Sequence, residues 1–451
     1  MQLTQSQCQQ ARMARDSRFD GRFFVAVKTT GIFCRPICPA NLPKEENVEY
    51  YPSSAHALHA GFRPCLRCRP DAAPSSWAWK GTEASFQRAV GLIEQGALQQ
   101  GTLAELAERL GITDRYLRQL FAQYLGIAPK QYAQMQQLLF AKQLLHQSQM
   151  SVADIAFASG FNSVRRFNDA FVKQLKLTPS QVRKKAPMSA ENKITLPYRG
   201  KLDWQHMLDF YSLRQIEGVE KIEQGRYWRR LIIGGKPCCF SIEPLKSGEL
   251  ELSFELEESR QLRPLVNGVR RMFDLDTDMD VVEQHLNQVD SNLVQRSGIR
   301  IPGVWSTWEA GVRAILGQQV SVKAAVGQLN LLCELCQPVE KERVFPSPKQ
   351  VLSADIEPLR MPTARKQTLR TFAEFMDQHS EQVPSEWLAL KGIGPWTVNY
   401  GLMRGASEPD CFLDQDLIVK KAMPRYPKLN KQSAAPWGSY ASLHCWNNGV
   451  E

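Results

Sequence analysis

Residues 390–397 read Leu390-Lys391-Gly392-Ile393-Gly394-Pro395-Trp396-Thr397, and this stretch predicts a hairpin turn followed by a helix. Glycine turns tightly because it lacks a Cβ atom, and Pro395 has the fixed φ that suits the first position of a helix. The helix, running on through Tyr400, would begin with free backbone N–H groups that can bind a phosphate. Asp416, which ends the segment Phe412-Leu413-Asp414-Gln415-Asp416, comes about one helix and one loop later, so we expect it near the ligand of the turn. An ordinary pair of helices joined by a glycine turn is the alternative.

With its surroundings, this stretch resembles the helix-hairpin-helix DNA glycosylases of the monofunctional 3-methyladenine type. The resemblance implies that the turn binds DNA through Gly392, Gly394 and Thr397. It also implies that Asp416 is catalytic, because hydrolysis of an N-glycosidic bond builds positive charge on the sugar and a carboxylate stabilises that charge or orients water. Relatives that also cut the strand have a lysine nucleophile where this chain has Trp396, so we expect an intact abasic site.

Aromatic residues are expected to hold the base after it leaves the DNA stack. By resemblance these are Phe210, Tyr400 and Trp446, although a core phenylalanine is the alternative for Phe210. Alkylated bases carry positive charge, which favours aromatic faces. Relatives often have aspartate where this chain has Gln415, a departure that bears on base preference.

Residues 308–321 predict an amphipathic helix, because their apolar residues recur three to four positions apart. The segment resembles the family helix that follows a DNA-probing loop, and the resemblance maps the apolar wedge of that loop onto Ile301. Such a wedge fills the gap left by an extruded nucleotide. Cys333 and Cys336 lie on an apolar helix pattern without a second Cys or His pair nearby, so we expect no metal site there.

Two cysteine pairs near the N-terminus, Cys34-x3-Cys38 and Cys65-x2-Cys68, predict a tetrahedral zinc site. Disulfides or chance clustering are the alternatives. The sequences around them, Phe24 to Pro36 and Gly61 to Cys68, resemble the N-terminal domain of Ada-type methyltransferases over nearly all of residues 10–72. The resemblance implies one Zn²⁺ and a second role for Cys34, as the nucleophile that takes a methyl group from a DNA methylphosphotriester. A purely structural zinc module is the alternative.

Residues 77–190 contain an internal repeat: Leu103-Ala104-Glu105-Leu106-Ala107 returns as Val152-Ala153-Asp154-Ile155-Ala156. Each copy has helical spacing and a break that fits a helix-turn-helix unit. The pair resembles the AraC-type DNA-binding domain. The second helices would present residue types that contact grooves and phosphates, foremost Arg115, Arg118, Arg165 and Arg166. Two helical bundles with solvated basic faces are the alternative.

Residues 191–286 predict a sheet. The segments 229–233 and 238–242 are bounded by glycine and proline, and 249–256 alternates polar with apolar residues. A helix near residues 204–214 precedes them. Cys238 and Cys239 would point to opposite faces of a strand and cannot share a metal. The segment resembles the N-terminal mixed α/β domain of the same glycosylases.

The length of the chain indicates how many domains it contains, and its charge indicates the type of partner. The chain has 451 residues, which suggests three or four domains, and 43% of them are apolar. Of the net charge of +10, residues 1–190 carry 24 basic minus 13 acidic groups, or +11, and residues 191–451 carry 32 minus 33, or −1. A basic front half favours a nucleic-acid partner. Because the sequence has neither a membrane-length apolar run nor a signal peptide, we expect a cytoplasmic protein whose 11 cysteines are thiols or metal ligands.

The sequence therefore predicts a multidomain α+β protein with a small four-cysteine zinc domain (1–76), an all-α double helix-turn-helix domain (77–190), a mixed α/β domain (191–286) and an all-α helix-hairpin-helix glycosylase domain (287–451). We expect repair of alkylated double-stranded DNA combined with binding to promoter DNA, no membrane partner, a monomer, and a contact with RNA polymerase. A transcriptional regulator with an inactive glycosylase tail and a DNA-bending protein are the alternatives.

Overall fold

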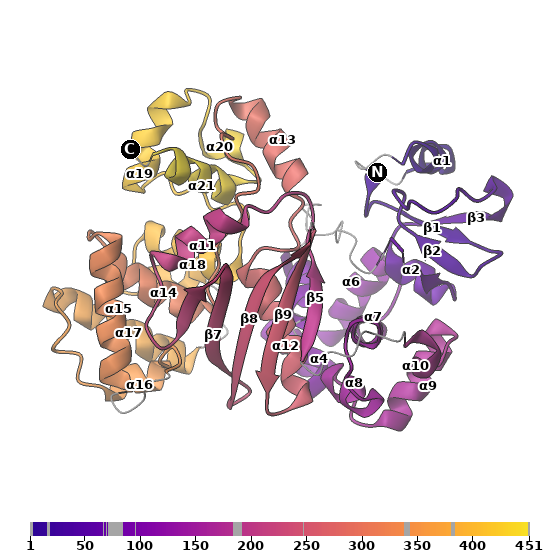
Figure 1. Cartoon of the computed structure of the whole chain (residues 1–451), viewed down its shortest axis with the longest axis horizontal. Helices are drawn as coiled ribbons and strands as arrows, with labels where there is room; N and C mark the ends of the chain where they lie inside the picture. The colour runs from indigo at the N-terminus through magenta and orange to yellow at the C-terminus, as the bar shows by residue number, and fades with distance from the viewer. Residues whose placement is uncertain are drawn as a thin grey trace. The chain divides into compact units, whose positions relative to one another are not determined.

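The computed structural model describes residues 3–15, 19–65, 67–68, 70, 84–94, 96–183, 192–246, 248–337, 343–379 and 384–449. The chain forms two compact units, the first comprising Met1–Ile194 with Glu258–Pro264 and the second Thr195–Glu257 with Leu265–Glu451 (Figure 1). The multidomain α+β class is confirmed. The expected domain boundaries near residues 76 and 190 lie outside the described residues, and the division into four domains stays a prediction.

The first unit begins with a small sheet of strand order β3-β1-β2-β4. Strand β1 runs antiparallel to β2 and β3, whereas β2 runs parallel to β4. The β2–β4 pairing places Phe33 beside Pro64, so Cys34 and Cys65, the next residues along each strand, come together. Two helices accompany the sheet. The elements are α1 (Gln5–Met13), β1 (Phe24–Val27), β2 (Ile32–Cys34), β3 (Val48–Tyr51), α2 (Ser54–His59) and β4 (Arg63–Pro64).

The rest of the first unit is helical and contains both predicted helix-turn-helix units. Each second helix starts at a hydroxyl cap: Thr113 accepts from the backbone N–H of Tyr116, and Ser163 accepts from that of Arg166. Such caps satisfy N–H groups that a helix start leaves unpaired. The helices are α3 (Ala84–Glu94), α4 (Ala97–Gln100), α5 (Leu103–Arg109), α6 (Asp114–Leu125), α7 (Pro129–Gln147), α8 (Val152–Ala158), α9 (Val164–Leu175) and α10 (Pro179–Val182).

The second unit contains a five-stranded sheet of order β5-β9-β8-β7-β6 (Figure 1). Strands β6 to β9 form consecutive antiparallel pairs. All three predicted strands are confirmed, and Cys238 is buried whereas Cys239 on the opposite face is half-buried. The strands are β5 (Lys193–Pro197), β6 (Glu220–Glu223), β7 (Arg226–Ile233), β8 (Lys236–Lys246) and β9 (Glu249–Leu256).

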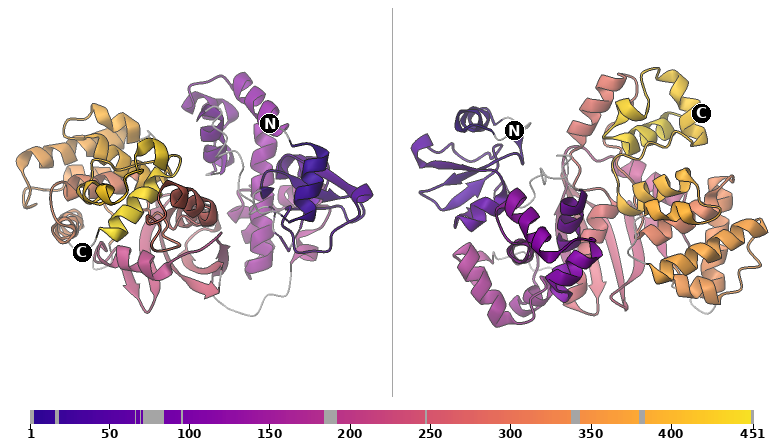
Figure 2. Two further views of the ribbon diagram at one scale, coloured as in Figure 1. Left: turned by 90° about the horizontal axis from the view of Figure 1, so that it is seen from above. Right: turned by 180° about the vertical axis from the view of Figure 1, so that it is seen from behind.

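Most helices after the sheet, salmon to yellow in Figure 2, pack around two apolar cores of described residues. Helix α18 belongs to both, because Val398 lies in one core and Met403 in the other. The helices of this unit are α11 (Trp204–Ser212), α12 (Leu262–Met272), α13 (Met279–Val289), α14 (Thr307–Gly317), α15 (Val322–Cys336), α16 (Pro348–Ser353), α17 (Thr363–Gln378), α18 (Pro395–Ala406), α19 (Leu417–Ala422), α20 (Lys431–Ala434) and α21 (Gly438–Asn448).

One sequence expectation about helices needs correction. The helix predicted over residues 308–321 ends at Gly317, because Gln319 adopts a left-handed backbone with φ of 56°. The helix before the hairpin turn is a 3-10 helix, η5 (Pro384–Ala389). Among the described residues, none of the helices combines the length and the apolar character that crossing a membrane requires.

A buried ion network joins the sheet to α14. Arg229 on β7 donates to Glu220 on β6 at 3.2 Å and to Glu309 on α14 at 2.5 Å. Arg313, one turn after Glu309, donates to the same two carboxylates, at 2.6 and 2.9 Å. Burial alone would raise the pKa of Glu309, but Arg229 and Arg313 outweigh it and hold the pKa at about 2. The two positive and two negative charges therefore compensate one another inside the unit.

Candidate functional site

The four predicted zinc ligands meet in one cluster. The Sγ atoms of Cys34, Cys38, Cys65 and Cys68 all lie within 4.8 Å of one another. A tetrahedral Zn²⁺ with Zn–S bonds of about 2.3 Å needs sulfurs about 4 Å apart, so this donor set fits the ion. Hydrogen bonding to Cys38 raises the pKa of the Cys34 thiol. Four thiolates this close also repel one another, and a bound cation offsets that repulsion. A Cys-bound zinc ion is therefore the cofactor that this cluster holds.

Cys34 differs from the other three ligands. It is half-buried, whereas the other three are buried. The backbone N–H of Ala40 hydrogen-bonds to the sulfur of Cys38, and that of Cys68 to the sulfur of Cys65. The backbone N–H of Arg35 hydrogen-bonds to the sulfur of Cys68. A reactive thiolate must be accessible, and the role of Cys34 as methyl acceptor stays a prediction.

The arginines proposed for DNA contact lie on the second helices of the two helix-turn-helix units. Arg115 and Arg118 on α6 and Arg165 and Arg166 on α9 lie at or near the surface. Arg118 pairs with Asp114 one turn earlier at 2.9 Å, an exposed pair that contributes little and leaves the guanidinium available. Their contact with DNA stays a prediction.

The two hairpin glycines have different reasons to be glycine. Gly392 has φ of 89°, and a Cβ atom there would lie 2.1 Å from Oγ1 of Thr368, so the fold requires glycine. Gly394 is the N-cap of α18, and a Cβ atom there would meet nothing within 4 Å. The fold alone does not explain Gly394, which leaves the helix start open to a ligand.

A matched pair of substitutions distinguishes the steric requirement for glycine at Gly392 from the open helix start at Gly394. Gly392→Ala is expected to destabilise the protein by about 1–3 kcal/mol, because alanine is strained at positive φ. Gly394→Ala should leave the free energy of unfolding within about 0.5 kcal/mol, since surface changes without strain cost little. It should weaken DNA binding, because a methyl group covers the free N–H groups. Chemical denaturation and DNA titration measure both quantities. Unchanged DNA affinity in folded Gly394→Ala would contradict an anion site here.

Thr397 and Ile301 were assigned to DNA contact; the structure contradicts the wedge role of the Ile301 side chain, whereas DNA contact at Thr397 stays a prediction. Thr397 is 2% exposed, and its Oγ1 accepts from Nε2 of Gln318. Ile301 is fully buried in the core around α13 and α21, so it cannot enter a duplex without leaving that core. The loop 318–321 does contact the hairpin turn, because Gln318 also donates to the carbonyl of Gly392.

Asp416 is the N-cap of α19 and is half-buried. Its Oδ1 accepts from the backbone N–H groups of Ile418 and Val419 at 2.9 and 3.3 Å. The indole Nε1 of Trp446 donates to the same oxygen at 3.0 Å, and that of Trp396 donates to Oδ2 at 3.2 Å. The carboxylate is thus held by one helix start and two indoles, and Oδ2 keeps capacity for one more contact.

The predicted base-binding aromatics surround this carboxylate. Phe210 on α11 and Trp446 on α21 face each other with ring centroids 6.4 Å apart and planes 19° from parallel. Tyr400 stacks on Trp396 at 5.2 Å. The structure therefore brings Phe210, Tyr400 and Trp446 to Asp416, and binding of a base stays a prediction. Trp396 was not assigned to the pocket from sequence, although its spacing of four from Tyr400 places both on one face of α18.

Two arginines also lie against this aromatic cluster and were missed. Arg404 is 1% exposed, donates to the hydroxyl of Tyr400 at 2.6 Å and lies 4.9 Å from the centroid of the Phe210 ring. Arg214 lies 3.7 Å from the same centroid. Burial alone would raise the pKa of Tyr400, but Arg404 and Arg214 outweigh it and lower that pKa. The spacing Tyr400-x3-Arg404, one helical turn, was the available signal for Arg404.

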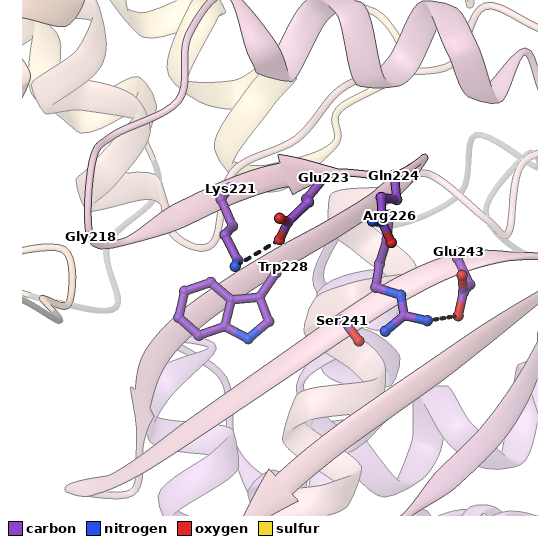
Figure 3. Close-up of a pocket in the computed structure, with 8 residues that line it drawn as sticks. All are labelled: Gly218, Lys221, Glu223, Gln224, Arg226, Trp228, Ser241 and Glu243. Atoms are coloured by element: carbon purple, nitrogen blue, oxygen red, sulfur yellow. Dashed lines mark hydrogen bonds and ion pairs between the residues drawn. The ribbon is translucent and has the colours of Figure 1, made fainter.

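A separate hollow on the exposed side of strands β6 to β8 does not resemble this pocket (Figure 3). Its volume is about 540 Å³, and it is lined by Trp228 among charged side chains. Lys221 pairs with Glu223 at 2.9 Å and Arg226 with Glu243 at 2.5 Å, so its charges neutralise one another. No catalytic residue predicted from the sequence lines it.

Gln415 is exposed, and its side-chain oxygen accepts from Nζ of Lys420 at 3.0 Å. It is therefore tied to the surface of α19 rather than to the indoles that hold Asp416. Its effect on base preference stays a prediction.

Comparison with known proteins assigns the same regions. Family models match residues 7–71 (metal binding domain of Ada), 106–185 (helix-turn-helix domain) and 193–306 (AlkA N-terminal domain). The chain is 29% identical to "DNA-3-methyladenine glycosylase 2" of Escherichia coli over 56% of this chain and 96% of that one. It is 41% identical to the E. coli "Bifunctional transcriptional activator/DNA repair enzyme Ada" over 29% of this chain and 36% of that one.

One relative is similar over almost the whole chain. The "Probable bifunctional transcriptional activator/DNA repair enzyme AlkA" of Mycobacterium tuberculosis is 32% identical over 97% of this chain and 95% of its own length. Its match spans the cysteine cluster, the helix-turn-helix units and the pocket around Asp416 together. The chain therefore belongs to the family of bifunctional transcriptional activator/DNA repair enzymes AlkA.

Proposed function

We propose that this chain repairs alkylated double-stranded DNA in two ways and regulates transcription. Its second unit hydrolyses the N-glycosidic bond of alkylated bases of the 3-methyladenine type, and Cys34 takes methyl groups from DNA methylphosphotriesters. The observation that carries the first activity is a carboxylate held by two indoles in an aromatic pocket: Asp416 with Trp396 and Trp446.

The pocket supports a simple sequence of events for base release. The open start of α18, after Gly394, binds a phosphate and positions the strand. The damaged nucleotide leaves the stack, and the loop 318–321 fills its place, the role first assigned to Ile301. The base then stacks between Phe210 and Trp446. As the bond breaks, Oδ2 of Asp416 stabilises the positive charge on the sugar, and water adds to the sugar.

The methyl acceptor activity follows from the geometry of Cys34. Bound Zn²⁺ would keep the four sulfurs as thiolates at neutral pH. The Sγ of Cys34 attacks the methyl carbon, a C–S bond forms, and the C–O bond of the phosphotriester breaks. Its electron pair stays on the phosphate oxygen, which leaves an ordinary phosphodiester. Because the thioether is stable, each protein molecule reacts once.

The regulatory part of the proposal rests on α6 and α9, whose surface arginines can contact promoter DNA. We propose the domain division 1–76, 77–190, 191–286 and 287–451 for these activities. We also propose a monomer in the cytoplasm that contacts RNA polymerase when bound at a promoter.

Base release tests the proposal directly. The purified chain, incubated with DNA alkylated by a methylating agent, should release free alkylated base and leave the strand intact at the abasic site. Chromatography of the supernatant measures the base, and denaturing electrophoresis measures strand integrity. Folded protein that binds DNA but releases no base would instead support a transcriptional regulator with an inactive glycosylase tail.

Borohydride reduction during turnover tests the water nucleophile. No covalent protein–DNA adduct is expected, because the position that forms an imine in strand-cutting relatives is Trp396, whose indole cannot. Lys391 is the nearest amine in sequence and supplies the control. An adduct that appears with the wild-type chain and disappears in Lys391→Ala would show that an amine attacks the sugar and that the hydrolytic mechanism is wrong.

A further inference from the structure

Arg214 is held firmly against the base pocket. It follows α11, and its backbone carbonyl accepts from Nη1 of Arg313 at 2.8 Å, a member of the buried ion network. Its own Nη1 donates to the carbonyl of Phe210 at 3.2 Å, and its guanidinium carbon lies 3.7 Å from the centroid of the Phe210 ring. The guanidinium is therefore stacked on one face of a ring whose other surroundings include Trp446.

The charge of Arg214 is not neutralised by a carboxylate. Burial lowers its pKa to about 10, so the side chain is still a cation at neutral pH. Among the described residues, the acidic groups of the ion network pair with Arg229 and Arg313, and no ion pair involves Arg214 or Arg404. The pocket thus combines two arginine cations with one carboxylate, Asp416.

This charge balance opposes the binding of a cationic base. A ring already in contact with a guanidinium offers less attraction to a second cation, because both draw on the same quadrupole. A positive base stacked beside Phe210 would also be repelled by Arg214 across one ring, in a site where burial weakens screening. Neither the weakened cation–π attraction nor the repulsion by Arg214 affects a neutral base. Phe210 therefore offers a cationic base less attraction than an aromatic ring without a guanidinium on its face.

We propose that Arg214 is a specificity-determining residue that lowers the preference of this pocket for positively charged alkylated bases relative to neutral damaged bases. The inference rests on the proposed glycosylase function. It concerns the charge class of the substrate rather than the existence of the reaction.

The test uses the full chain and two duplex oligonucleotides, one with a single 7-methylguanine, which is cationic, and one with a single hypoxanthine, which is neutral. Single-turnover rates of base release are measured for wild type, Arg214→Gln and Arg214→Lys. Glutamine can still donate to the Phe210 carbonyl but has no charge. The rate ratio of 7-methylguanine to hypoxanthine should rise about tenfold in Arg214→Gln and stay within about twofold of wild type in Arg214→Lys.

Controls separate this effect from a loss of structure. Arg226→Gln, in the hollow of Figure 3, makes the same chemical change outside the pocket and should leave the ratio unchanged. Arg214→Met, which keeps an apolar stem on Phe210, replaces Arg214→Gln if the latter does not fold. A purely structural role would lower both rates equally. An unchanged or lower ratio in the uncharged variants, or an equal rise in Arg214→Lys, overturns the inference. Release of neither base by wild type overturns the proposed function instead.

Discussion

Replacing Asp416 with asparagine is expected to slow base release on the order of 10²-fold or more, while DNA binding survives. Asparagine caps a helix about as well as aspartate, so α19 should keep its start. The three donors at Oδ1, from Ile418, Val419 and Trp446, can still be satisfied by the amide oxygen. The amide nitrogen then replaces Oδ2 and faces the indole N–H of Trp396. Because both groups are hydrogen-bond donors, the contact with Trp396 becomes repulsive. Both the charge and the orientation of the group are lost.

Single-turnover kinetics on alkylated duplex DNA measure this effect, and a binding titration with the same duplex supplies the control. Asp414→Asn, two residues earlier in the same loop, is the matched substitution and should keep a rate close to wild type. Near-normal excision by folded Asp416→Asn would remove Asp416 from the catalytic role.

Methylphosphotriester DNA is expected to transfer one methyl group to Cys34 and to no other residue. Cys34 is half-buried, whereas the other three cysteines of the cluster are buried. Peptide mass spectrometry should therefore find a single added methyl on the peptide that contains Cys34. Cys34→Ser should abolish transfer completely. Cys8→Ser, which changes a buried thiol outside the cluster, should accept the methyl normally.

The transfer should also strengthen DNA binding. A thioether is neutral, so methylation removes one negative charge from a zinc site of formal charge −2, and the gain should be larger at low salt. DNA titrations of the methylated and unmethylated chain at two salt concentrations measure it. A methyl group found on another residue, or on none, would disprove the acceptor role of Cys34.

Much of the candidate site follows from sequence because its signals are local. The resemblance and the spacing together named Asp416, Tyr400, Trp446 and Phe210, and the structure gathers all four. They failed for the wedge at Ile301 and did not foresee that the side chain of Thr397 is buried, although both residues lie in recognisable motifs. A motif describes the path of the backbone, whereas exposure of a side chain depends on which distant segment packs over it. Ile301 is covered by the core around α13 and α21. The side-chain Oγ1 of Thr397 accepts a hydrogen bond from Gln318.

The sequence by itself determined the elements whose causes lie within a few residues: the turn at Gly392, the strand β9 from its alternation, and the cysteine pairs from their spacing. Tertiary structure alone decided that Phe210 meets Trp446 and Arg404, and that the carbonyl of Arg214 is held by Arg313. It also decided that Trp396 donates to Asp416. Backbone conformation obeys local steric rules. The charge and reach of a pocket depend instead on side chains from segments far apart in the chain, and only packing brings those together.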